Sequence, residues 1–130
     1  MVELIWDAAR SGTLNAPIDS SVTIGDGADF SPEDLMAASV AGCLMRTFLD
    51  LADETGISVL SYASAAGVDT SEDPSRVIVR CHVVVTDRVA DQTIRRLLRE
   101  SVRISPVCRM LGGRIVCQPD IRCLRGACAS

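Results

Sequence analysis

The stretch FSPEDLMAASVAGCLMRTFLDLADETG, residues 30–56, decides the fold of this 130-residue chain because it predicts one long helix. Ser31 is a good N-cap and Pro32 suits the first helical position, while the two acidic residues that follow favour the positive end of the helix dipole. Gly56 is a typical helix stop. Apolar residues occur nearly all round this helix. We therefore expect it to be buried on all sides, with a second copy of the chain as a candidate for part of the covering surface.

The composition argues against several classes of protein. A net charge of −4, a pI near 4.9 and only 3% aromatic residues leave little for nucleic acid to bind. The first ten residues lack the basic and apolar regions of a signal peptide. Arg46 and Asp50 interrupt the apolar helix, so we expect no membrane span and a cytoplasmic protein. There, six cysteines are expected to be reduced, catalytic or metal-bound rather than a disulfide framework.

The pattern along the whole chain, residues 1–130, indicates a single α+β domain. The clearest strand has apolar residues at every odd position from Val77 to Val85. The stretch from Asp91 to Arg103 predicts an amphipathic helix. Further elements are expected as short strands within residues 1–30, a strand at 58–68, a short helix between Pro106 and Gly112, and a last strand at 115–117 that ends before Pro119.

Four of the cysteines have simple structural interpretations. Cys81 lies on the apolar face of the clearest strand and is most simply a small core residue, as is Cys117 on the last strand. Cys123 and Cys128 are either incidental or form a labile disulfide. A metal site at the C-terminal cysteines is a weak alternative, because the sequence has no CxxC pair and only one histidine.

Cys108 and Cys43 remain as candidates for chemistry. With Ser105 as N-cap, Cys108 falls in the first turn of a short helix, where free amides, the dipole and the neighbouring Arg109 favour a thiolate. The alternative for Cys108 is a buried cysteine on a short helix. Cys43 lies in the middle of the apolar helix, where burial disfavours the thiolate. On the helix pattern alone, Cys43 is therefore an inert core residue.

The motif Ser31-Pro32-Glu33-Asp34-Leu35-Met36-Ala37-Ala38, followed by Cys43 and by Ser105-Pro106-Val107, resembles the OsmC/Ohr family of osmotically inducible and organic hydroperoxide resistance proteins. In that family a P-E-x-L element opens a long central helix, and a cysteine follows the glutamate by ten residues, as Cys43 follows Glu33. A second family cysteine begins a C-P element, whereas this chain has Ser105 there and its nearest cysteine at Cys108. The resemblance implies an OsmC-like α+β fold, with antiparallel sheets wrapped around a long central helix in an intertwined homodimer.

The activity that the resemblance implies is reduction of organic hydroperoxides by a thiol peroxidase, in defence against oxidative stress. Cys43 would become a sulfenic acid, Cys108 is the candidate for the resolving thiol, and an external dithiol would reduce the resulting disulfide. Glu33 and an arginine would assist Cys43, and Arg10 is the sole arginine before the long helix. We expect no cofactor and no metal. The alternative function is an OsmC-like dimer that binds a ligand or acts as a scaffold, with lost or altered peroxidase activity.

Helix geometry bears on both halves of this hypothesis. The displacement from position 105 to Cys108 amounts to about 5 Å along a helix, which leaves open whether Cys108 reaches Cys43. Glu33 and Cys43 are separated by about 15 Å on one straight helix. If both act on one peroxide, Glu33 must come from the partner subunit.

Overall fold

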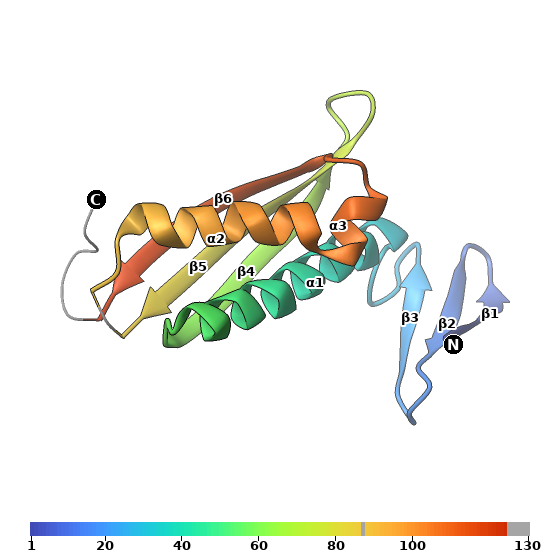
Figure 1. The fold of residues 1–130 in the computed structure, drawn as a ribbon. Helices are drawn as coiled ribbons and strands as arrows, with labels where there is room; N and C mark the ends of the chain where they lie inside the picture. The colour runs from blue at the N-terminus through green and yellow to red at the C-terminus, as the bar shows by residue number, and fades with distance from the viewer. Residues whose placement is uncertain (87, 125–130) are drawn as a thin grey trace. The chain divides into compact units, whose positions relative to one another are not determined.

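The computed structural model describes residues 1–86 and 88–124, which form two compact units, one made by Met1–Met36 and the other beginning at Ala37. The first unit contains an antiparallel sheet in the order β1 (Glu3–Ala8), β2 (Ser11–Asn15) and β3 (Ser21–Gly25). Helix α1 (Pro32–Thr55) begins in the first unit and continues into the second. The remaining elements of the second unit are β4 (Val59–Asp69), β5 (Arg76–Val85), α2 (Asp91–Ile104), α3 (Pro106–Met110) and β6 (Ile115–Cys123) (Figure 1).

The predicted long helix is confirmed as α1. The Ser31 hydroxyl accepts a hydrogen bond from the Asp34 N–H at 3.0 Å, and the Asp34 carboxylate accepts one from the Ser31 N–H at 3.2 Å. This reciprocal arrangement satisfies two backbone donors at the helix start. Gly56 ends the helix with a φ of 76°, a conformation that other residues adopt only at a cost.

Burial of α1 differs from the prediction, because only one of its faces is buried within this chain. The buried residues recur at helical spacing and are Ala37, Val40, Leu44, Phe48 and Ala52. Between them, Met45 is 37% exposed. The expected burial on all sides is therefore not achieved by a single chain, since its own sheet and helices cover one side only.

The sheet of the second unit has the order β4-β5-β6. It confirms the α+β class, with one difference from the expected antiparallel sheets: β4 is antiparallel to β5, but β6 is parallel to β5. Helices α2 and α3 lie between β5 and β6 in sequence and supply the long connection that a parallel pair requires. β6 also runs through Pro119, whereas the sequence predicted an end before it. A proline is tolerated there because β6 is an edge strand of this sheet.

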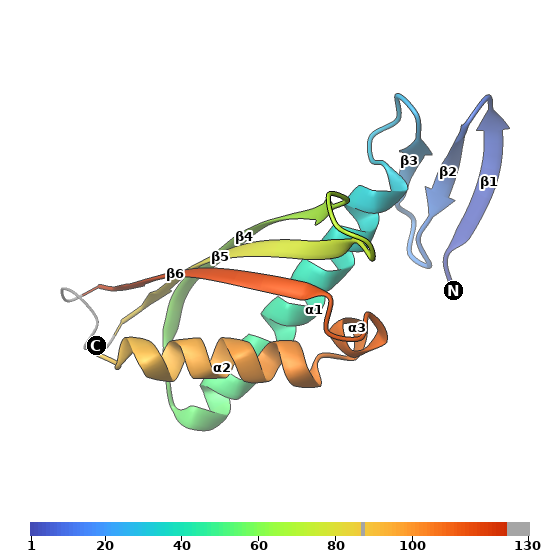
Figure 2. The same ribbon diagram turned by 90° about the horizontal axis from the view of Figure 1, so that it is seen from above.

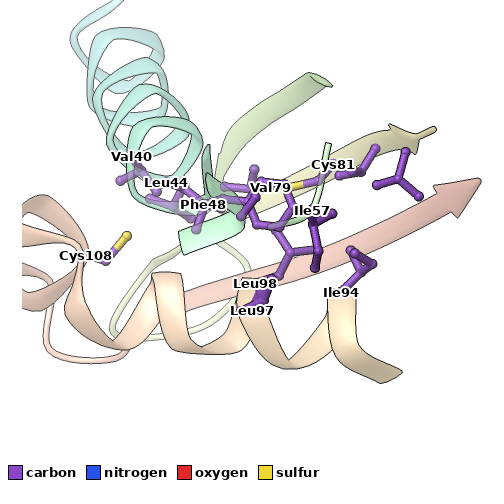
Figure 3. Packing of buried hydrophobic residues seen from close by; sticks show 14 of the residues in the cluster. Val40, Leu44, Phe48, Ile57, Val79, Cys81, Ile94, Leu97, Leu98 and Cys108 are labelled. Carbon is purple, nitrogen blue, oxygen red and sulfur yellow. The ribbon is translucent and has the colours of Figure 1, made fainter. Parts of the chain in front are cut away.

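The core of the second unit lies between this sheet and the helices α1 and α2, which Figures 1 and 2 show on the same face of the sheet. The odd-numbered positions of β5 point into this core, as predicted. Figure 3 shows Val79 and Cys81 of β5 in one cluster with Leu44 and Phe48 of α1 and Leu98 of α2. The Phe48 ring also lies 5.7 Å from the Tyr62 ring of β4, measured between centroids. Burial of these apolar faces is the main force that holds the layers together.

Helix α1 also bears on the question of a membrane. Within the described residues it is the one helix long and apolar enough to cross a bilayer, with a mean hydropathy of 1.4 in its most apolar window. Arg46 and Asp50 thus do not exclude a span by composition, contrary to the sequence argument. The core helix of a soluble protein passes the same test. The complete burial of Leu44 and Phe48 supports that role for α1.

Candidate functional site

The second unit contains two of the predicted site residues, Cys43 and Cys108. Cys43 lies in the middle of α1 as a half-buried free thiol, and Cys108 lies in the first turn of α3 with 2% of its surface exposed. A negative charge on Cys43 contributes to raising the pKa of Cys108, so the two sulfurs are close enough to interact electrostatically. Figure 3 shows the Cys108 side chain directed from α3 toward α1. This arrangement places a second thiol beside the proposed nucleophile.

The electrostatics of Cys108 correct a prediction made from its place in a helix. We expected the helix start and Arg109 to favour its thiolate, but burial is the largest effect and raises the pKa of Cys108. The Ser105 hydroxyl and the backbone amide of Cys108 act in the opposite direction and are weaker. Arg109 is exposed and is not among the groups that shift this pKa. Cys108 is therefore a protonated thiol at neutral pH.

Ser105 also differs from its predicted role, because its side chain does not cap α3. The Ser105 Oγ lies 2.9 Å from the Thr47 Oγ1 of α1 and 2.5 Å from the carbonyl oxygen of Ser101 in α2. Ser105 is completely buried. Thr47 follows Cys43 by one helical turn. The bond between the two hydroxyl groups therefore ties the start of α3 to the part of α1 that carries Cys43.

A second pair of thiols, which the sequence analysis missed, lies on the inner face of the sheet. The Cys81 Sγ on β5 is 3.7 Å from the Cys117 Sγ on β6 and 3.4 Å from the Tyr62 Oη on β4. The hydrogen bond with Cys117, and a smaller contribution from Tyr62, lower the pKa of Cys81 to about 7 although burial opposes the change. The same bond and burial raise the pKa of Cys117. Burial and the bond to Cys81 raise that of Tyr62.

The backbone keeps Cys81 and Cys117 from closing an unstrained disulfide. Cys117 pairs with Val79, and Cys81 lies two residues farther along β5. With strands about 4.8 Å apart and a rise of about 3.3 Å per residue, the two Cα atoms are about 8 Å apart. A disulfide requires about 4.4–6.8 Å. Cys81 and Cys117 are therefore free cysteines whose sulfur atoms lie within hydrogen-bonding distance of each other.

The first unit contains the other two predicted site residues, Arg10 and Glu33. Arg10 lies in the turn between β1 and β2 and lines a surface pocket of about 350 Å³, together with apolar side chains that include Trp6 and Ile24. Gly25 closes against this turn: its φ is 125°, and an added Cβ would lie 2.1 Å from the Arg10 carbonyl oxygen. Glu33 is exposed in the first turn of α1. Their part in the chemistry of Cys43 stays a prediction.

The metal alternative concerned the C-terminal cysteines. Across residues 1–86 and 88–124, no group of three or more histidine, cysteine or acidic side chains could hold a metal ion. Cys117 is a free thiol that is hydrogen-bonded to Cys81, and Cys123 is disulfide-bonded. Cys128 lies outside the described residues, and so does the predicted pairing of Cys123 with Cys128.

Comparisons with known proteins agree with this architecture. A family described as OsmC-like protein matches residues 25–120. An OsmC-like protein of unknown function from Vibrio cholerae is 16% identical, with a TM-score of 0.79 over 92% of this chain and 97% of that chain. An organic hydroperoxide resistance protein from Legionella pneumophila is 17% identical, with a TM-score of 0.67 over 93% and 96%. One from Bacillus subtilis is 16% identical, with a TM-score of 0.64 over 93% and 97%. No curated protein matches the chain.

Proposed function

The chain belongs to the family of OsmC-like proteins, and from this premise we propose that it is a thiol peroxidase that reduces organic hydroperoxides through Cys43. The observation that carries the proposal is the half-buried free thiol of Cys43 on α1 with the Cys108 thiol beside it. Two proteins of the same fold are named organic hydroperoxide resistance proteins, which supports the same substrate class.

The proposed cycle uses two thiols. The Cys43 thiol releases its proton, and the resulting thiolate attacks one oxygen of the hydroperoxide. The O–O bond breaks, Cys43 becomes a sulfenic acid, and the leaving alkoxide takes up a proton, equivalent to the one that Cys43 released, and departs as an alcohol. The Cys108 sulfur then attacks the Cys43 sulfur, the S–O bond breaks, and water leaves with the proton that Cys108 gives up. An external dithiol reduces the Cys43–Cys108 disulfide by exchange and restores both thiols.

We also propose that the protein works in the cytoplasm as a homodimer in which the partner completes the site. Support comes from apolar surface that one chain leaves uncovered, including Leu4 at 63%, Trp6 at 75% and Met45 at 37% exposure. Arg10 and Glu33 both lie in the unit that does not contain Cys43. In the dimer, we expect these two side chains to reach Cys43 from the partner subunit and to stabilise its thiolate and orient the peroxide.

The decisive test is consumption of cumene hydroperoxide with dithiothreitol as reductant. Wild-type protein should turn over, and Cys43→Ser should lose turnover with an unchanged circular dichroism spectrum, because the nucleophile is lost and the volume is nearly kept. Cys117→Ser removes a different thiol and serves as the matched control, with turnover expected. Full turnover in Cys43→Ser would refute the role of Cys43. A wild-type protein without turnover would instead leave the alternative of a dimeric binding or scaffold protein.

A further inference from the structure

Resting on the proposed function, we propose that Ser105 is a positioning residue for the resolving step. Its hydroxyl bonds Ser101 and Thr47 while Cys108 is a thiol, and turns to donate a hydrogen bond to the Cys108 sulfur as that thiol gives up its proton. Ser105 touches neither peroxide nor the Cys43 sulfur in this role. It acts by stabilising the attacking form of Cys108.

The resting arrangement follows from the hydrogen bonds of Ser105. A hydroxyl has one hydrogen, and a carbonyl oxygen only accepts, so Ser105 donates to the Ser101 carbonyl at 2.5 Å and accepts from the Thr47 hydroxyl at 2.9 Å. The Ser101 carbonyl also accepts the Ser105 backbone N–H at 2.9 Å. The Ser101 carbonyl therefore still accepts one hydrogen bond when the Ser105 hydroxyl rotates away. The rotation leaves no buried acceptor without a donor.

The position of Ser105 allows the second arrangement. It is the N-cap residue of α3, and Cys108 is the third residue of that helix, the position toward which an N-cap side chain normally points. Because the hydroxyl is engaged by Thr47 and Ser101, it makes no cap bond to a backbone amide. The Cys108 N–H is therefore available to donate a hydrogen bond to the sulfur of the same residue. Both this amide and the Ser105 hydroxyl favour the Cys108 thiolate.

Burial makes such a hydrogen bond consequential. Ser105 is 0% exposed and Cys108 is 2% exposed, so water does not substitute for a missing protein donor. An unpaired thiolate in this place would carry the full cost of leaving water. A single hydroxyl that is already held next to the sulfur removes part of this cost at the moment of attack.

A purely structural role for Ser105 makes a different prediction, which two variants separate. Ser105→Ala and Thr47→Val both delete the hydroxyl contact between α3 and α1. Only Ser105→Ala also removes the donor to Cys108. In Thr47→Val, Ser105 loses a bond in which it only accepts and keeps its own hydrogen to donate. Under our proposal, Ser105→Ala therefore disfavours the Cys108 thiolate, whereas Thr47→Val leaves the ionisation of Cys108 nearly unchanged. Ser105→Thr keeps a hydroxyl at the same place and is the conservative rescue.

The experiment has two readouts. The ionisation of Cys108 is followed by NMR titration of protein labelled with ¹³Cβ-cysteine, and its signal is assigned by comparison with Cys108→Ser. The rate of disulfide formation is followed by quenched mass spectrometry after one equivalent of cumene hydroperoxide. Ser105→Ala should raise the titration midpoint and slow disulfide formation at pH 7 by about tenfold, as expected for loss of a hydrogen bond to a charged group. Thr47→Val should leave the midpoint and the rate near their wild-type values, and Ser105→Thr should restore both quantities.

The proposal would be overturned if Ser105→Ala and Thr47→Val changed the Cys108 titration midpoint and the rate of disulfide formation equally and in the same direction. Ser105 would then have only a structural role, in connecting α3 to α1. Circular dichroism confirms that each variant is folded before it is compared. The proposed peroxidase function is tested separately: it is refuted if dimedone traps no sulfenic acid on Cys43 of the wild-type protein after addition of the hydroperoxide. The NMR titration needs no peroxide, so it decides the role of Ser105 in either case.

Discussion

Replacing Cys117 by alanine should remove a pH-dependent gain in stability that the fold obtains from Cys81. The pKa of Cys81 falls from an ordinary value of 9.0 to about 7. Between these pH values the unfolded chain binds a proton that the folded chain has released, so the free energy of unfolding rises with pH. The complete rise corresponds to about 3 kcal/mol; it is absent below pH 7 and fully present above pH 9.

The structure identifies Cys117 as the main cause of this rise. Its hydrogen bond is the largest effect on the Cys81 thiolate, and Tyr62 contributes less. Without the Cys117 hydrogen bond, burial raises the pKa of Cys81 and only the weaker effects of Tyr62 and His82 oppose it. The gain in stability between pH 7 and pH 9 should therefore disappear. Cys117→Ser retains a donor at this place and should retain the rise. In the wild-type protein the raised pKa of Cys117 adds a loss of stability at pH above 9.0, since the folded chain then holds a proton that the unfolded chain has released.

Urea unfolding at pH 6, 7, 8 and 9 measures this effect, in excess phosphine reductant and at one fixed protomer concentration. Far-UV circular dichroism is the suitable probe. The single tryptophan, Trp6, is 75% exposed and belongs to the first unit, whereas Cys81 and Cys117 belong to the second. The free energies of wild type, Cys117→Ala and Cys117→Ser are compared at each pH. An alanine variant that still gains about 3 kcal/mol between pH 7 and pH 9 would refute the assignment of the Cys81 shift to Cys117.

Three further outcomes are expected. Leu44→Ala should lower the free energy of unfolding by about 2.7–5 kcal/mol because Leu44 is completely buried, whereas Glu54→Ala on the exposed side of α1 should stay within about 0.5 kcal/mol in the same urea assay. Ser31→Ala should cost about 1 kcal/mol through loss of the N-cap bond, and Ser31→Gly only a few tenths; equal costs would contradict a capping role. Peptide mapping after one equivalent of hydroperoxide should find a Cys43–Cys108 disulfide, and Cys43 as sulfinic acid beside a free Cys108 thiol would exclude Cys108 as the resolving residue.

The parts of the fold that the sequence predicts well depend on local signals. The bounds of α1 follow from Ser31 and Gly56, whose capping geometry needs no tertiary contact to be recognised. The alternation from Val77 to Val85 likewise predicts β5 and its buried face. The strand β6 was missed beyond Cys117 because Pro119 signals an end, and only the position of β6 at the sheet edge makes the proline compatible with a strand.

The features of the candidate site that depend on tertiary contacts are likewise not predictable from the sequence. Motif spacing singles out Cys43 and Cys108, but the burial that raises the pKa of Cys108 arises from packing between α3 and the core. The sequence offers no signal for the contact of Cys81 with Cys117, since it requires the parallel register of β5 and β6. Had residues 115–123 been predicted as a strand beside β5, the odd-numbered cysteines of both strands would have been candidates for contact.

The parallel pairing of β5 with β6 makes folding of the second unit depend on a long-range step. Paired residues such as Arg80 and Gln118 are separated by 38 positions, whereas β4 and β5 form a hairpin around one short loop. Loop closure of this length slows the formation of non-local contacts. Until β6 docks, β5 exposes an unpaired backbone edge next to an apolar face, which is a template for pairing with another chain. The yield of refolding should therefore fall steeply as the protein concentration rises, with the losses confined to the interval before β6 reaches its place.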